Sequence, residues 1–177
     1  MKKKKILISP WSRPRTDGKQ NAKNYPYWNE LVIMLDRDEY DVIQLIHGNE
    51  QQLLVNGITF KKDLTLPQIE KLVLSCDTFV CVDNFLQHLG HYVGVRGFVL
   101  YGVSDPSLFG YDTNINIYAG RKYFRQYQFQ TWNEVEFNAE AFVNPNRVFE
   151  IIKTHMPVND SPIAGETLRE EGADFVK

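Results

Sequence analysis

The sequence predicts an α/β protein with an open, mostly parallel sheet and helices on both faces. Two short apolar runs, residues 79–82 and 98–101, are rich in β-branched and aromatic residues, which is typical of buried strands. Between them apolar residues recur at helical spacing, Asn84 is placed to cap the helix and Gly94 to end it. Because strand, helix and strand follow within about 25 residues, the connection is a right-handed crossover between parallel strands.

Length and composition indicate a globular chain with one domain over residues 1–157. Hydrophobic residues make up 43% of the 177 residues and charged residues 24%, enough apolar material for a core without disulfides. Lys2–Lys5 supply four of the 20 basic residues, so the rest of the chain carries 16 basic and 22 acidic residues. The net negative charge of the chain after Lys5 argues against non-specific DNA binding.

The positions of the cysteines and histidines indicate the cellular compartment of the protein and whether it binds a metal. Cys76 and Cys81 fall at a helix end and in a buried strand, and we find no signal peptide and no run of 18 apolar residues. We therefore expect reduced thiols, a cytoplasmic location and no membrane span. His88 and His91 lie three positions apart but lack a third ligand, so we predict no metal site.

The elements before residue 76 follow the same alternation of strand and helix. Ile6–Ser9 and Val42–Ile46 are buried strands by pattern, and residues 27–35 between them form an amphipathic helix. A short edge strand is expected at 58–60, followed by a helix that Thr65 caps. The apolar stripe of that helix predicts a core element with no part in a site: Leu66, Ile69, Leu72, Val73 and Cys76.

The elements after residue 106 are less regular. A further strand is predicted at 115–118, and residues 144–155 form a last amphipathic helix. Residues 121–138 are rich in aromatic and basic side chains and predict either an extended hairpin or a loop, whose rings pack on the sheet or stack on bases. The polar tail 158–177 is expected to be disordered or to dock on a partner.

Polar side chains gather where the predicted strands end. Asp83 and Asn84 follow the strand at 79–82, and Ser104 and Asp105 follow the strand at 98–101. The loop 11–24 follows the first strand and carries four cations: Arg13, Arg15, Lys19 and Lys23. Because the carboxyl ends of parallel strands meet at one edge, where helix N-termini attract anions, we expect an anion-binding site there.

Two segments at this edge resemble the signature of a known family. Residues 82–89, VDNFLQHL, and 100–106, LYGVSDP, are similar to the D-[ST]-G-x-x-H-L and [FY]-G-x-[ST]-D-P motifs of the heptosyltransferases, glycosyltransferase family 9. The resemblance covers residues 5–120 and concerns the C-terminal domain of these two-domain GT-B enzymes. It implies a Rossmann-like fold that binds a nucleotide-sugar and transfers the sugar with inversion, with the donor as substrate and no cofactor.

The resemblance implies six substrate-binding residues: Lys23, Glu50, Asp83, Asn84, Phe85 and His88. Lys23 corresponds to a family lysine near the sugar-nucleotide phosphates, and Glu50 to an acid that accepts hydrogen bonds from the ribose. Asp83 is expected to hold sugar or ribose hydroxyls. His88 is expected to reach the phosphate or to position Asp83. The N-terminus of the helix at Asn84 and the cations of the loop are expected to stabilise the leaving diphosphate.

Several of these residues have a structural alternative. Lys23 is also explained as a solvated loop lysine, Glu50 as the first residue of a short helix at 50–55, and His88 as a core histidine bonded to a backbone carbonyl. Phe85 departs from the family pattern, which has glycine there so that backbone N–H groups approach the phosphate closely.

Three functions fit the sequence. The first is a glycosyltransferase half completed by a separate acceptor-domain subunit or a homo-oligomer, because the family's N-terminal domain, which supplies the catalytic base, has no counterpart in the sequence. The second is a non-catalytic module that binds a nucleotide or nucleotide-sugar, and the third is a regulatory subunit with an empty cleft. The nucleotide base, the sugar and the acceptor stay open, and nucleic acid is a partner only if the acceptor is a modified base.

Overall fold

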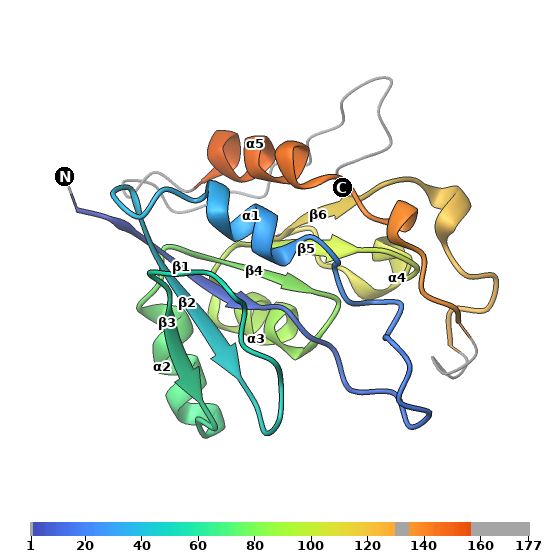
Figure 1. Ribbon diagram of the computed structural model, residues 1–177, viewed down its shortest axis with the longest axis horizontal. Helices are drawn as coiled ribbons and strands as arrows, with labels where there is room; N and C mark the ends of the chain where they lie inside the picture. Colours follow the sequence, from blue (N-terminus) through green and yellow to red (C-terminus); the bar gives the residue numbers. More distant parts are fainter. Residues whose placement is uncertain (1, 130–134, 157–177) are drawn as a thin grey trace.

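The computed structural model describes residues 2–129 and 135–156, and a six-stranded sheet lies at its centre (Figure 1). All strand pairs in these residues are parallel, in the order β3-β2-β1-β4-β5-β6. The strands are β1 Lys4–Ser9, β2 Tyr40–Ile46, β3 Thr59–Lys62, β4 Thr78–Val82, β5 Gly97–Tyr101 and β6 Ile115–Tyr118. The predicted open parallel α/β sheet is confirmed.

Two pairs of helices cover the two faces of the sheet (Figure 1). Helices α1 (Trp28–Met34) and α5 (Pro145–His155) pack on one face, and α2 (Leu66–Leu74) and α3 (Phe85–Val93) on the other. The short helix α4 (Pro106–Phe109) follows β5. The prediction of helices on both faces is therefore confirmed.

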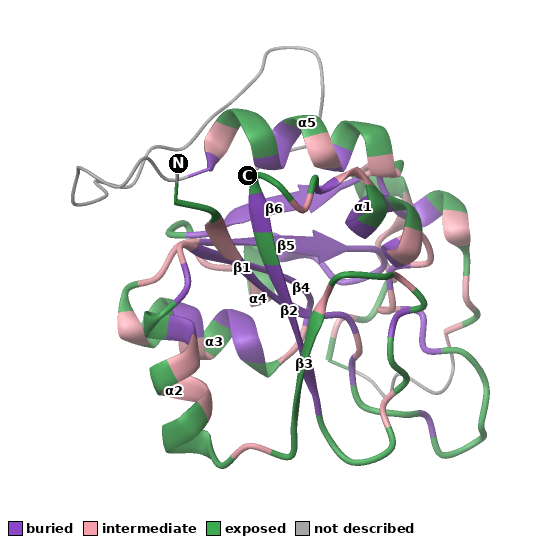
Figure 2. Cartoon of the chain, turned by 60° about the vertical axis from the view of Figure 1, so that its left-hand side comes forward, coloured by how far each residue is buried: buried purple, intermediate pink, exposed green. Residues whose placement is uncertain are grey.

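The core consists of two apolar layers, one on each side of the strands. Along β1, Ile6 and Ile8 join the cluster under α1 and α5, whereas Leu7 joins the cluster under α2 and α3. Successive side chains of a strand point to opposite faces, so a strand buried on both sides is apolar at every position. Figure 2 shows the result, with buried strands between helices whose outer sides are exposed.

Two glycines set how closely α3 approaches the sheet. A Cβ atom at Gly90 would lie 2.1 Å from the ring of Phe79 in β4, and one at Gly97 would lie 2.2 Å from the same ring. The ring therefore occupies the space that two side chains would need. This close packing fixes α3 against β4 and β5, and with it the turn between β4 and α3 that carries Asp83 and Asn84.

The alternative of a short helix at 50–55 is wrong. The side chain of buried Gln44 donates to the carbonyl of Gln51 and accepts from the N–H of Leu53, both at 2.9 Å. These bonds hold the segment in a non-helical path, because they take the backbone groups that a helix would pair. The edge strand forms one residue later than predicted, at 59–62.

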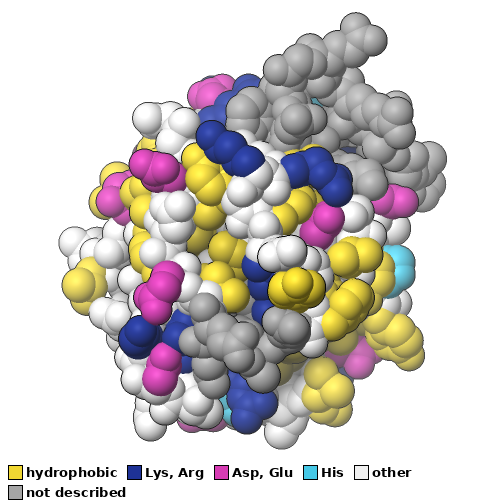
Figure 3. All heavy atoms as spheres, turned by 90° about the vertical axis from the view of Figure 1, so that its right-hand side faces the viewer, with side chains coloured by type: hydrophobic (Ala, Val, Ile, Leu, Met, Phe, Trp, Pro, Cys, Tyr) yellow, Lys and Arg dark blue, Asp and Glu magenta, His cyan; other side chains and the backbone are white. Residues whose placement is uncertain are grey.

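The segment 121–129 forms a loop with one 3₁₀ turn, Arg121–Tyr123, so the hairpin alternative is wrong for these residues. The N–H of Arg125 donates to the carbonyl of Val103, and the side chain of Gln128 bonds the backbone of Asp105 and Arg125, which curls the chain. Aromatic side chains are exposed here, Phe129 to 82%, and this face shows hydrophobic groups beside Lys and Arg (Figure 3). The predicted tail 158–177 lies outside the described residues.

Candidate functional site

A cavity of about 780 Å³ opens at the carboxyl ends of β1, β2 and β4. Strand β1 lies between β2 and β4, and the chain leaves β1 toward β2 but later returns to β4 on the other side. The strand order therefore reverses between β1 and β4, and open α/β sheets bind their ligands at such a point. Ser9, Ile46 and Asp83, each at the end of one of these strands, line the cavity.

One end of the cavity is polar and is held by a buried hydrogen-bond network. The ammonium of Lys23 lies 2.7 Å from Oδ2 of Asp83, and the two side chains are 16% and 7% exposed. Asp83 also accepts from Ser104 Oγ and from Gln87 Nε2, both at 2.7 Å. Tyr101 donates to Gln87 Oε1, and burial raises the pKa of Tyr101, so its hydroxyl keeps the proton it donates. The network fixes Lys23 at the cavity wall.

The loop 11–24 is held in place by its own polar residues. Asn24 accepts from both the N–H and the hydroxyl of Ser12. The guanidinium of Arg15 pairs with Asp17, and this bond lowers the pKa of Asp17 to about 2. Arg15 is therefore engaged within the loop, whereas exposed Arg13 has no side-chain partner among residues 2–129 and 135–156 and lines the cavity.

Asn84 and Glu50 occupy the middle of the cavity wall. Asn84 caps α3 by accepting from the N–H of Leu86 at 3.0 Å, and its amide donates to Ser9 and to the carbonyl of Trp11. Glu50 accepts from the N–H of His47 at 2.8 Å, and burial raises its pKa. The Asn84 bonds join the ends of β1 and β4, and the Glu50 bond holds the turn after β2.

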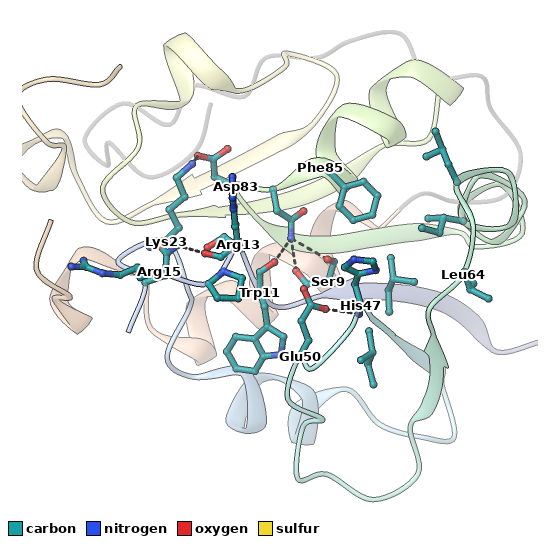
Figure 4. A pocket seen from close by; sticks show the side chains of 18 of the residues that line it. Ser9, Trp11, Arg13, Arg15, Lys23, His47, Glu50, Leu64, Asp83 and Phe85 are labelled. Atoms are coloured by element: carbon teal, nitrogen blue, oxygen red, sulfur yellow. Dashed lines mark hydrogen bonds and ion pairs between the residues drawn. The ribbon is translucent and has the colours of Figure 1, made fainter. Parts of the chain in front are cut away.

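The other end of the cavity is apolar. Leu64, in the turn before α2, lies across from Phe85 at the start of α3 (Figure 4). Leu66 and Ile69, at the start of α2, also line the cavity. Two of these side chains remain largely uncovered, since Leu66 is 61% exposed and Phe85 44% exposed. Large apolar side chains exposed in a concave site are typical of a ligand-binding surface.

Five of the six predicted site residues line this one cavity: Lys23, Glu50, Asp83, Asn84 and Phe85. His88 does not line it. His88 is exposed on the outer side of α3, where its Nδ1 lies 2.9 Å from the hydroxyl of Tyr111. The structure therefore places His88 neither beside Asp83 nor in the core. Nor is Lys23 a solvated loop lysine.

Sequence reasoning missed the apolar wall of the cavity. The predicted core role of α2 holds for Val73, which is buried, and for Ile69 and Leu72, which pack against the core. The prediction that α2 has no part in a site is wrong, because Leu66 and Ile69 line the cavity. One sequence signal was present: a helix that follows a parallel strand begins at the carboxyl edge of the sheet, where ligands bind. Apolar residues in such a first turn are therefore candidate ligand contacts.

The part of the chain that the structure describes contains neither a cluster of metal ligands nor a helix able to span a membrane. Within residues 2–129 and 135–156, no three His, Cys, Asp or Glu side chains come together as metal ligands would. Among the same residues, no helix has the length and apolar content needed to cross a bilayer. Cys76 and Cys81 are buried free thiols, as predicted.

The sheet order and the position of the cavity define the chain as a Rossmann-like α/β protein with a site at the strand switch point. The chain belongs to glycosyltransferase family 9 (heptosyltransferase), whose sequence profile matches residues 1–134. Comparison with curated protein sequences gives no significant match.

Solved structures of heptosyltransferases share this fold. The Escherichia coli heptosyltransferase WaaC with ADP has a TM-score of 0.65 and 15% sequence identity, over 86% of this chain and 44% of that chain. E. coli ADP-heptose lipopolysaccharide heptosyltransferase II has a TM-score of 0.61 and 19% identity, over 86% and 46%. A family 9 glycosyltransferase from Veillonella parvula DSM 2008 has a TM-score of 0.63 and 15% identity, over 86% and 46%. The chain thus spans less than half the length of each of these proteins.

Proposed function

We propose that this chain binds a nucleotide-sugar and acts as the donor-binding part of an inverting glycosyltransferase, with a partner chain or a second copy supplying the acceptor side. Membership of family 9 supports glycosyl transfer in general. The free buried thiols support a cytoplasmic location, where thiols stay reduced. The catalytic base is not assigned to any residue of the chain.

The observation that carries the proposal is the division of one cavity into a cationic end and an apolar end. Its volume of about 780 Å³ lies within the range of small-molecule sites. Lys23 and Arg13 line one end, and Leu64 and Phe85 line the other (Figure 4). Leu66, at the start of α2, also lines the cavity. A nucleotide-sugar has the same division, since a flat base lies at one end and a diphosphate with its sugar at the other.

The cationic end suits a leaving diphosphate. Lys23 and Asp83 balance each other in charge, as do Arg15 and Asp17, so Arg13 supplies the net positive charge of this end. A fixed positive charge beside the bond that breaks stabilises the charge that develops on the diphosphate. Asp83 acts here by holding Lys23 in place, because three groups already bond its two oxygens.

A second candidate is binding without chemistry. The two carboxylates that line the cavity, Asp83 and Glu50, are both bonded to groups of the chain itself, so neither is placed as a base toward a ligand. In that case the protein would hold a nucleotide or nucleotide-sugar and release it unchanged.

A binding and turnover experiment separates the two candidates. We expect ADP, the nucleotide named for the WaaC structure, to raise the melting temperature, and Arg13→Gln to weaken ADP binding by about tenfold, because a charge-assisted hydrogen bond is lost. Lys122→Gln is the matched control, since Lys122 is an exposed cation outside the cavity. The measurement is titration calorimetry at low and high salt, where the loss in Arg13→Gln shrinks as salt rises.

Turnover is then followed with ADP-heptose as the donor. Release of ADP, alone or after addition of a candidate acceptor chain, supports the transferase. Binding of ADP-heptose without release of ADP supports the binding module. If ADP, UDP and GDP all leave the melting temperature unchanged, both candidates are rejected. Native mass measurement of the same sample determines whether a second copy is present.

A further inference from the structure

We infer that Phe85 determines the ligand preference of this cavity. Its ring stacks on the base of the bound nucleotide, and its presence at the start of α3 leaves the diphosphate to the side-chain cations of the loop 11–24. The inference rests on the proposed function and makes it specific, because it says which part of the ligand supplies the affinity.

The first support is the exposure of the Phe85 ring. Phe85 is 44% exposed although it lies in a concave site, and no aromatic ring among the described residues pairs with it. Other rings of the protein are paired, such as Tyr111 with His91 at 3.9 Å. The Phe85 ring lies on the side of Leu64 and away from Lys23 (Figure 4). A nucleobase is flat and has two apolar faces, so it is suited to stack on the Phe85 ring opposite this apolar wall.

The second support is the hydrogen bonding at the start of α3. The first turn of a helix has four N–H groups without partners inside the helix, and these attract phosphates. Here the N–H of Leu86 is bonded to the Asn84 side chain, so this group is already engaged. The N–H of His88 belongs to a residue that does not line the cavity. The benzyl side chain of Phe85 stands at the same turn, where it crowds the approach of a phosphate to the backbone.

The third support is the position of the cations. Arg13 and Lys23 lie at the end of the cavity that is opposite Leu64 (Figure 4). A diphosphate held there leaves the base to reach back along the cavity toward Phe85. The three observations agree on one arrangement, in which the base contacts the ring and the diphosphate contacts the loop.

The test compares three probes, adenosine, ADP and inorganic pyrophosphate, on the wild-type chain and on Phe85→Leu and Phe85→Gly. Phe85→Leu keeps apolar bulk but loses the flat ring, so adenosine and ADP should bind about fivefold more weakly while pyrophosphate binding is unchanged. Phe85→Gly should weaken adenosine by about tenfold and strengthen pyrophosphate, because the backbone becomes open to the anion.

The matched control is Tyr92→Leu, which replaces another ring of α3 that is 82% exposed and outside the cavity. It should leave all three affinities within twofold of the wild type. An unchanged affinity for adenosine in Phe85→Leu overturns the inference, and so does weaker pyrophosphate binding in Phe85→Gly. If the wild-type chain binds none of ADP, UDP and GDP, the proposed function itself fails, which is a separate result. Phe85→Leu decides the question if Phe85→Gly does not fold.

Discussion

The two ends of the cavity are built in opposite ways. At the polar end, Asp83 bonds both Lys23 and Gln87, and all three side chains are largely removed from water. At the apolar end, Leu66 and Phe85 are exposed in the unliganded protein. The polar groups of one end are paired as soon as the chain has folded, whereas the apolar groups of the other end are shielded from water only when a ligand covers them.

This difference separates stability from binding. Groups that pair with one another on folding contribute to the free energy of unfolding, and their loss destabilises the protein. The exposed area of an apolar side chain contributes nothing to folding, and burial of that area by a ligand contributes to binding instead. Substitutions at the two ends should therefore affect different measurements.

The largest expected effect is at the polar end. Asp83→Ala leaves the ammonium of Lys23 mostly buried without its carboxylate and removes the acceptor of Ser104 and Gln87. Removing one partner of a buried ion pair costs about 3 kcal/mol. We therefore expect the free energy of unfolding in urea to fall by that amount.

The control for this prediction is the exposed pair Lys19–Glu136, whose side chains are 58% and 78% exposed. Glu136→Gln should change the free energy of unfolding by less than about 0.5 kcal/mol, because water screens the pair. Equal urea midpoints for Asp83→Ala and Glu136→Gln would show that the polar end is not preassembled, and the comparison between the ends would fail.

The parts of this site that were predictable from sequence are those fixed by strand ends. Asp83 directly follows a buried strand, so it must lie at the carboxyl edge of the parallel sheet. Asn84 caps the helix that begins there, so it must lie at the same edge. The fold was predictable for the same reason, since strands buried on both faces are apolar at every position. The pairing of Lys23 with Asp83 was not, because it depends on how a 14-residue loop folds back over the sheet.

The second prediction concerns the apolar end. Leu66→Ser removes an apolar side chain that is 61% exposed, so the urea midpoint should stay unchanged. If ADP or adenosine covers this side chain, both ligands lose about 1 kcal/mol of binding free energy, which is about fivefold in affinity. Calorimetric titration of both ligands measures the effect.

A control for Leu66→Ser lies on the same helix. Leu74 is 56% exposed, belongs to α2 and is not part of the cavity lining. Leu74→Ser should leave both affinities at the wild-type value. Equal losses in the two variants would mean that serine disturbs α2 as a whole, and the apolar end would lose its role in binding.

His88 shows why sequence spacing alone misplaces a side chain. Each residue of an α-helix is turned by about 100° from the one before it. Leu86 and Gln87 take the buried face of α3, so His88 turns outward toward Tyr111. The motif indicated that a helix begins after Asp83. Which side of the helix is covered depends on contacts that Gly90 and Phe79 make, and these become visible only in three dimensions.

The smallest expected effect is a difference in pH dependence between Asp17, which pairs with Arg15 in the loop 11–24, and Glu50, which lines the cavity. The bond with Arg15 lowers the pKa of Asp17 to about 2, so the stabilisation is present above its ordinary pKa of 3.8 and is lost as the pH falls through about 2. Burial raises the pKa of Glu50, so stability is fully present below its ordinary pKa of 4.5 and is lost as the pH rises through the raised value.

The variants Asp17→Asn and Glu50→Gln make the two pH windows measurable by thermal unfolding. Asp17→Asn should be less stable than the wild type at neutral pH, with the gap closing only as the pH falls from about 4 toward about 2. Glu50→Gln should gain stability relative to the wild type as the pH rises above about 4.5, because the wild type then carries a half-buried charge. Two curves that change in the same pH window would mean that both carboxylates sit in equivalent surroundings, and the contrast between a carboxylate paired with a cation and one held by burial would fail.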